Sequence, residues 1–355
     1  MRLVHVVGAR PNLMKLAPVY RAFAAVPDIE QSVVHTGQHY DLNMSDVFFQ
    51  QLGLNSPDVN LHVGSASHAK QVAEIMVRFE KVLSDTRPDL VLVYGDVNST
   101  IAAALVCSKM RIRLGHVEAG LRSFDRSMPE EINRLLTDQI ADFLFTPSED
   151  ANQNLAREGA PAEVINLVGN VMIDSLVRML PACQMHLPPN LPSHFALVTL
   201  HRPSNVDDLP WLDEMLQSLA QIAARLPILF PVHPRTKERM IGLRDGWPSA
   251  LRLMEPLPYL AFLALEQQAT VVITDSGGIQ EETTYLGVPC LTIRENTERP
   301  ITVKIGTNIL VGRDQKRIRD QVEQIISGIR KKGKIPPLWD GHAAERIVEV
   351  IHRLV

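Results

Sequence analysis

The sequence is poor in the features that mark several classes of protein. It has three cysteines among 355 residues, far apart and in no CxxC pair, so neither a disulfide framework nor a zinc knuckle is expected. Aromatic residues make up 5%, and the formal net charge is −4, without the large basic excess of a general nucleic-acid binder. No window approaches the roughly 18 to 20 apolar residues of a membrane span, and no apolar leader follows Met1. We therefore expect a cytoplasmic protein that binds neither nucleic acid nor membrane.

What the chain does contain is the composition of a soluble globular protein, with 45% hydrophobic and 21% charged residues. Short Val/Ile/Leu-rich runs alternate with helix-length stretches, which is typical of a parallel sheet covered by helices on both faces. Strands are expected at residues 3–8, 31–36, 90–94, 113–118, 143–146 and 164–168, and again at 195–200, 227–232, 251–254, 271–274, 290–293 and 308–311.

The two halves are separated by a proline-rich segment without periodicity, PACQMHLPPNLP at residues 181–192. The sequence thus predicts an α/β protein of two Rossmann-like doubly wound domains that face a central cleft. Ligands of such sheets bind at the carboxyl ends of the strands. The expected division is domains at 1–178 and 195–340, a linker at 179–194, and a C-terminal helix at 341–355 packing back on the first domain.

The string TDSGGIQEE at residues 274–282 follows an expected strand and opens an expected helix. Gly277 and Gly278 allow backbone N–H groups to approach phosphate oxygens, and the helix N-terminus adds partial positive charge. Ser276 adds a hydroxyl donor, and Glu282 can accept two hydrogen bonds from a ribose cis-diol. The alternative is a plain strand–turn–helix junction with a side-chain cap. The whole string favours a nucleotide diphosphate site.

Acidic residues follow several strands of the first half: Asp96, Glu118, and Glu130 beside Glu131. A carboxylate after a buried strand loses solvation, and neighbouring carboxylates raise each other's pKa, which suits general acid–base catalysis. For each residue alone, a helix cap or an ion pair with a nearby arginine is an equal alternative. The spacing does not favour a metal cluster.

Basic residues follow strands in both halves. Arg10 and Lys15 come after the first strand, without the GxGxxG spacing of a dinucleotide fingerprint. Either could be a surface cation, but together they could neutralise a departing phosphate. Arg299 supplies a further cation in the loop TERP.

Two histidines occupy equivalent places in the second half. His201 and His233 each follow a strand beside an arginine, which favours phosphate contact or proton transfer near neutral pH. A structural hydrogen bond is the alternative for each of them. Phe262 could stack on a base or simply pack in the core.

Ten strings occur in the order seen in one family: GARPNLMKLAP, TGQHYD, YGDVNST, HVEAGLRS, MPEEINR, VGNVMIDS, LHRPSNVDD, HPRT, TDSGGIQEE and TERP. Over about residues 4–312 the chain resembles the non-hydrolysing UDP-N-acetylglucosamine 2-epimerases. The resemblance implies a GT-B architecture and a homodimer. It also implies elimination of UDP to 2-acetamidoglucal and re-addition with the C2 proton on the opposite face, with neither NAD nor a metal.

The resemblance also assigns residues to roles. The catalytic set is Asp96, Glu118, Glu130 and His201, with Glu131 as the alternative to Glu130. The UDP-binding set is Arg10, Lys15, His233, Phe262, Ser276, Gly277, Gly278, Glu282 and Arg299.

Other activities stay open. The HYD in TGQHYD also occurs in relatives that act on UDP-2,3-diacetamido-glucuronic acids. A hydrolysing 2-epimerase and a GT-B glycosyltransferase are further alternatives. The string TGQHYDLNMS at residues 36–45 departs from the pattern that supports allosteric activation in many bacterial members.

Overall fold

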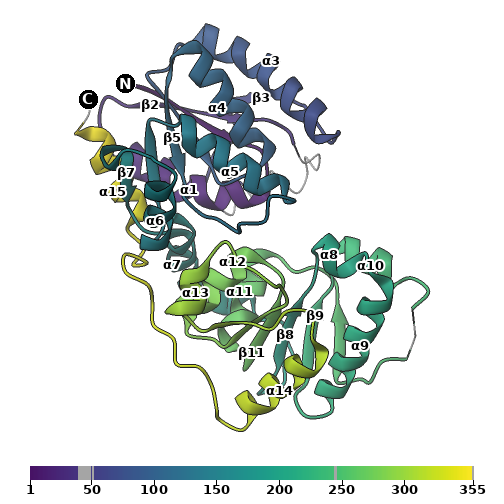
Figure 1. The fold of residues 1–355 in the computed structure, drawn as a ribbon. Helices are drawn as coiled ribbons and strands as arrows, with labels where there is room; N and C mark the ends of the chain where they lie inside the picture. Colours follow the sequence, from purple (N-terminus) through teal and green to yellow (C-terminus); the bar gives the residue numbers. More distant parts are fainter. Residues whose placement is uncertain (39–48, 50–51, 244–245, 354–355) are drawn as a thin grey trace. The chain divides into compact units, whose positions relative to one another are not determined.

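The computed structural model describes residues 1–38, 49, 52–243 and 246–353, and it divides into two compact units (Figure 1). Unit 1 comprises Met1–Ser175 and Pro337–Val355, and unit 2 comprises Leu176–Pro336. Most of the TGQHYDLNMS string, including its HYD, lies outside the described residues. No helix in the described part of the chain combines the length and apolarity that crossing a bilayer requires.

Unit 1 is built on a seven-stranded parallel sheet with the order β3-β2-β1-β4-β5-β6-β7. This order, outward from β1 in both directions, is that of a doubly wound sheet. Its strands are β1 (Arg2–Val7), β2 (Glu30–His35), β3 (Val59–Asn60), β4 (Leu90–Tyr94), β5 (Arg113–Val117), β6 (Phe143–Thr146) and β7 (Ile165–Leu167).

The helices of unit 1 cover both faces of this sheet. They are α1 (Arg10–Ala24), α3 (His68–Thr86), α4 (Asn98–Met110), α5 (Pro129–Ile140), α6 (Glu149–Arg157) and α15 (Ala343–His352). Helix α7 (Val171–Cys183) begins in unit 1 and ends in unit 2. The last helix packs against the first, since α15 contacts α1. The first turn of α15 is held by Asp174 of α7, whose carboxylate accepts hydrogen bonds from the N–H groups of Ala343 (3.1 Å) and Ala344 (2.7 Å).

Unit 2 repeats the scheme with a six-stranded parallel sheet in the order β10-β9-β8-β11-β12-β13. Its strands are β8 (Ala196–Thr199), β9 (Ile228–Pro231), β10 (Leu251–Met254), β11 (Val271–Thr274), β12 (Cys290–Thr292) and β13 (Asn308–Leu310). Its helices are α8 (Pro203–Val206), α9 (Leu209–Ala223), α10 (Pro234–Met240), α11 (Tyr259–Gln268), α12 (Gly277–Leu286), α13 (Pro300–Lys304) and α14 (Gln315–Ile326).

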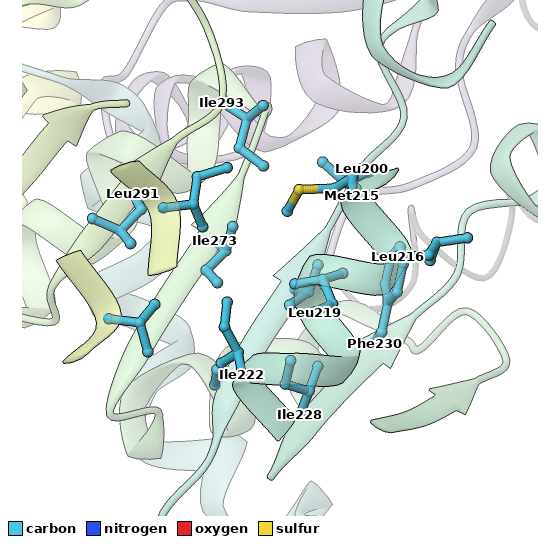
Figure 2. Close-up of a cluster of buried hydrophobic side chains, with 14 of the residues drawn as sticks. Leu200, Met215, Leu216, Leu219, Ile222, Ile228, Phe230, Ile273, Leu291 and Ile293 are labelled. Carbon is cyan, nitrogen blue, oxygen red and sulfur yellow. The ribbon is translucent and has the colours of Figure 1, made fainter. Parts of the chain in front are cut away.

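The core of unit 2 shows why continuous apolar strands are needed. On one face, Ile228, Phe230 and Ile273 of the strands pack against Leu219 and other side chains of α9, all fully buried (Figure 2). On the other face, alternate residues of the same strands pack against α11 and α12. Because both faces of the sheet are covered, its strands do not alternate between apolar and polar residues. The burial of these apolar side chains stabilises the sheet.

The predicted two-domain doubly wound α/β fold is confirmed, and each expected strand is present to within two residues at either end. Sequence analysis missed β3, which is too short to show a period. The proline-rich connection begins later than its first proline suggested, because Pro181 lies inside α7 and residues 184–186 form a 3₁₀ turn.

Candidate active site

The predicted site residues follow the carboxyl ends of neighbouring strands in each unit. In unit 1, Arg10 is the exposed first residue of α1 after β1, Asp96 follows β4, and Glu118 follows β5. These three strands are adjacent, so their loops meet at one edge of the sheet. Unit 2 has an equivalent edge, with His233, His201, Ser276 and Arg299 after β9, β8, β11 and β12. Among the described residues, no group of three or more His, Cys, Asp or Glu side chains could hold a metal ion.

Lys15 and Glu118 form a buried ion pair in unit 1, with side chains 7% and 4% exposed. The backbone of Glu118 has φ +74°, a left-handed conformation that costs a residue other than glycine about 1 to 3 kcal/mol. Gly95 lies against the pair, since a Cβ there would stand 2.6 Å from Lys15 Nζ and 3.2 Å from Glu118 Oε2. The structure commits Lys15 to this carboxylate, and its predicted contact with phosphate stays a prediction.

Asp96 is held at its backbone and at its side chain by the same helix, α5. Arg134 forms an ion pair with the Asp96 carboxylate, and Asn133 Nδ2 donates to the Asp96 carbonyl at 2.8 Å. The arginine is buried, whereas the Asp96 side chain remains 28% exposed. A fixed and solvent-accessible carboxylate of this kind can exchange a proton with a ligand.

The two glutamates at the start of α5 differ sharply in their surroundings. Glu131 is buried and accepts hydrogen bonds from the backbone of Ser123 (3.0 Å) and Phe124 (2.8 Å) and from Arg134 (2.6 Å). Burial alone would raise the pKa of Glu131, but these donors hold it below its ordinary value. Glu130 is half-buried and has no hydrogen bond or ion pair with the described part of the chain. Its carboxylate is therefore the one left for a ligand.

Helix α5 buries a polar face rather than an apolar one. Its buried side chains are Glu131, Asn133, Arg134, Thr137 and Asp138. Large apolar side chains of the same helix, Ile132 and Leu136, are 37% and 49% exposed. Sequence analysis missed Arg134 and Asp138 as parts of the site. Their spacing of four and eight residues from Glu130, which places all three on one helical face, is the signal that could have found them.

In unit 2, α12 begins directly after β11 with Ser276 as its N-cap residue. The Ser276 side chain makes no capping hydrogen bond, so it satisfies none of the first N–H groups of this helix. A Cβ at Gly277 would stand 2.5 Å from Arg299 Nη1, so a side chain at this position would displace the arginine. Gly278 follows in the same first turn. This helix start has the features of an anion site.

Three guanidinium groups lie close to this turn. Arg294 Nη2 and Arg299 Nη1 are 2.7 Å and 2.5 Å from the Glu298 carboxylate, and Arg202 is 3.8 Å from it. Burial would raise the pKa of Glu298, but the arginines hold it well below its usual range. Arg294 Nη1 is buried and makes no hydrogen bond to any described residue. A buried donor without a partner is costly, and an anion would satisfy it.

His201 and Asp275 form a pair at the ends of β8 and β11. Asp275 Oδ1 is 2.8 Å from His201 Nδ1, and its two oxygens also accept from the backbone of His201 and Arg202 and from Asn205. Burial alone would raise the pKa of Asp275, but the hydrogen bond and charge of His201 hold it below its ordinary value. Nδ1 of His201 therefore carries a proton, and Nε2 of a side chain 40% exposed is left to take or give one.

His233 lies beside His201, with 5.7 Å between the ring centroids. Its Nδ1 accepts a hydrogen bond from the backbone of Arg235 at 3.2 Å, so the neutral ring carries its proton on Nε2. Burial and the neighbouring His201 lower the pKa of His233. A neutral donor at this position can bind a phosphate oxygen.

Glu282 is buried and already has protein partners. The hydroxyl of Tyr259 donates to Glu282 Oε1 at 2.7 Å, and the fully buried Glu266 lies against it. Burial, together with the charge of Glu282, raises the pKa of Glu266 well above its ordinary value, so Glu266 stays neutral and can donate to Glu282. The predicted ribose contact of Glu282 would use its remaining acceptor capacity. Phe262 is half-buried and packs on the apolar cluster of β8 and α11, which favours the core alternative.

Comparisons with known proteins agree on one family. The family model described as UDP-N-acetylglucosamine 2-epimerase matches residues 21–352. UDP-N-acetylglucosamine 2-epimerase of Methanocaldococcus jannaschii is 42% identical over 366 residues, 99% of each chain. Its crystal structure with UDP-GlcNAc and UDP superposes with a TM-score of 0.91, at 41% identity, covering 99% of this chain and 100% of that one. UDP-2,3-diacetamido-2,3-dideoxy-D-glucuronate 2-epimerase of Pseudomonas aeruginosa is 39% identical over 361 residues, the whole of both chains.

Proposed function

The chain belongs to the UDP-N-acetylglucosamine 2-epimerase family, and we propose that it interconverts UDP-N-acetylglucosamine and UDP-N-acetylmannosamine by inverting C2. The observation that carries this proposal is the set of carboxylates at adjacent strand ends in unit 1. Glu118 and Asp96 are each fixed by a buried cation, and Glu130 in the first turn of α5 is without a described partner. An epimerase needs acid–base groups on both faces of the sugar, and this set can supply them.

The mechanism we propose is elimination followed by addition. The C1–O bond breaks and UDP leaves with the electron pair, while a carboxylate removes the C2 proton to give 2-acetamidoglucal. UDP then adds back to C1, and a proton reaches C2 from the opposite face. The C2 proton is not acidic, so C1–O cleavage runs ahead and builds positive charge on the sugar. Asp96, Glu118 and Glu130 would stabilise that charge.

Unit 2 supplies most of the groups that we assign to the nucleotide. The diphosphate would bind at the start of α12, near the guanidinium groups of Arg202, Arg294 and Arg299. His233 would donate a hydrogen bond to it. We assign the ribose to Glu282 and proton transfer to the leaving oxygen to His201. The remaining predicted UDP contacts, Arg10, Lys15, Phe262, Ser276, Gly277, Gly278 and Arg299, stay part of the proposal.

Proton NMR in deuterated water tests the reaction and the substrate together. With UDP-N-acetylglucosamine, we expect deuterium to enter C2 as signals of the manno isomer appear. Stoichiometric release of free UDP would instead identify a hydrolysing 2-epimerase. Turnover only with an added sugar acceptor would identify a GT-B glycosyltransferase. If the substrate stays unchanged, turnover of UDP-2,3-diacetamido-glucuronate would identify the second candidate, which the P. aeruginosa relative favours.

A matched pair of substitutions separates the two glutamates of α5. Glu130→Gln is expected to lower kcat by about 10²-fold or more without changing the melting temperature, because its carboxylate holds no described part of the protein. Glu131→Gln is expected to lower the melting temperature, because an amide in that place cannot accept all the bonds from Ser123, Phe124 and Arg134. Calorimetry and initial rates measure both. The reverse pattern would transfer the catalytic role to Glu131.

The homodimer implied by the resemblance and the cytoplasmic location expected from the sequence remain predictions. Two neighbouring apolar side chains of α5, Ile132 and Leu136, are partly exposed and would suit a second copy. Light scattering that gives the mass of one chain would contradict the dimer.

A further inference from the structure

A buried polar network lies behind the carboxylates of unit 1 and has no part in the mechanism above. Its centre is Asp138 of α5, with His116 of β5 on one side and Arg122 on the other. All three side chains are at most 1% exposed. Buried charges are costly unless they are paired and hydrogen-bonded, so such a network calls for a role.

The two oxygens of Asp138 reach two different turns. Oδ1 is 2.6 Å from His116 Nδ1, and His116 Nε2 is in turn 2.8 Å from the carbonyl oxygen of Gly95. Oδ2 accepts from the N–H of Gly120 at 3.1 Å and lies 2.7 Å from Arg122 Nη2. Gly95 precedes Asp96, and Gly120 comes two residues after Glu118. One carboxylate thus connects the turns that carry two of the proposed catalytic groups.

The connection to the first turn runs through the His116 ring. A backbone carbonyl only accepts, so His116 donates from Nε2 to Gly95. Its Nδ1 lies 2.6 Å from Asp138 Oδ1, so the carboxylate orients the ring that holds the carbonyl of Gly95. Burial would raise the pKa of Asp138, but His116 and Arg122 hold it below its ordinary value.

The two turns need support from outside. Gly95 has φ +62°, Glu118 +74° and Gly120 +80°, all in the left-handed region. Of these, Glu118 is strained there because it has a side chain. Gly95 also has no free space, since its missing Cβ would meet Lys15 Nζ and Glu118 Oε2.

We infer that Asp138 is a positioning residue that fixes both Asp96 and Glu118, through the His116 ring at the first turn and through Gly120 at the second. The inference rests on the proposed function, because it supposes that these two carboxylates act on the substrate. Asp138 itself touches neither of them. It acts on the backbone beside each.

The test compares two variants of the same network. Asp138→Asn keeps the shape of the side chain but places an amide N–H₂ where one oxygen faces His116 or Gly120. We expect kcat to fall by about 10²-fold, the usual effect of misplacing a reacting group by 1 Å, with UDP affinity unchanged. Glu158→Gln is the matched control, because the Glu158 carboxylate accepts from Nε and Nη2 of the same arginine, Arg122, and bonds to neither turn in the described structure. Its kcat is expected to stay near that of the unchanged protein.

A second variant keeps the test possible if the first does not fold. If Asp138→Asn does not fold, His116→Gln takes its place, since its amide can still donate to Gly95. We expect it to retain more activity than His116→Leu. Equal loss in Asp138→Asn and Glu158→Gln, in proportion to melting temperature, would overturn the inference in favour of a general structural role. So would unchanged kcat in Asp138→Asn. An unchanged protein that epimerises none of the UDP-sugars would instead overturn the proposed function.

Discussion

Replacing Glu118 by glutamine is expected to lower kcat by about 10²- to 10⁴-fold, the range that a general acid–base group contributes. The amide cannot take or give the proton, and it cannot stabilise positive charge on the sugar. The affinity for UDP is expected to stay unchanged, because the groups assigned to the nucleotide lie chiefly in unit 2. Initial rates by NMR and titration calorimetry with UDP measure the two effects separately.

The same substitution should also reduce stability, and the loss has a clean control. Lys15 is buried against Glu118, and a buried lysine without its partner costs about 3 to 5 kcal/mol. The double variant Lys15→Met/Glu118→Gln removes this lone charge and should recover much of the stability, while kcat stays low. Activity that returned together with stability would show that the single variant had failed through folding.

Replacing Asp275 by asparagine is expected to lower kcat by an amount on the order of 10²- to 10⁴-fold, although Asp275 need not touch the substrate. The ionised carboxylate holds the proton of His201 on Nδ1, and an amide N–H₂ turned toward the ring would favour the wrong tautomer. A double-mutant cycle tests this route. In a His201→Asn background, Asp275→Asn should cost little further activity. Fully additive losses would mean that the two residues act independently.

Asp275 should also make the stability of unit 2 depend on acid. Its pKa in the folded state lies below its ordinary value, so its ionised form stabilises the fold at pH above about 4. This contribution is lost as the pH falls through the folded-state pKa. The Asp275→Asn variant should lack this part of the acid dependence. Thermal unfolding followed between about pH 3 and 7 compares the two proteins, and identical slopes would contradict the expectation.

The fold could be predicted from sequence because the central strands of both sheets are buried on both faces. Runs such as residues 90–94 and 271–274 are buried throughout, and the structure places strands at those residues. The exceptions have local causes. Strand β3 has two residues and no period, and Pro181 continues a helix where proline usually ends one.

Residues of the candidate site are easier to identify from sequence where the side chain follows a strand than where it lies within a helix. Asp96, Glu118 and His201 each lie within two residues of the end of a strand, and this placement identifies them as candidates. Arg134 and Asp138 lie within α5, whose buried face is polar. A search for apolar periodicity therefore does not identify the face of this helix that is buried. Glu130 and Glu131 could not be told apart from the sequence, because adjacent residues of the same type differ only in their hydrogen-bond partners in the folded protein.

The path of the chain also determines the order in which the two units can fold during synthesis on the ribosome. Unit 2 interrupts unit 1, whose last piece, Pro337–Val355, contains the helix that packs against α1. At about 5 to 20 residues per second, roughly 10 to 30 s pass between the synthesis of Ser175 and that of Pro337. During that interval α1, which carries Lys15, lacks its neighbour α15. Unit 2, which is continuous in sequence, can mature first, and the carboxylates of unit 1 acquire their complete surroundings only when the chain is almost finished.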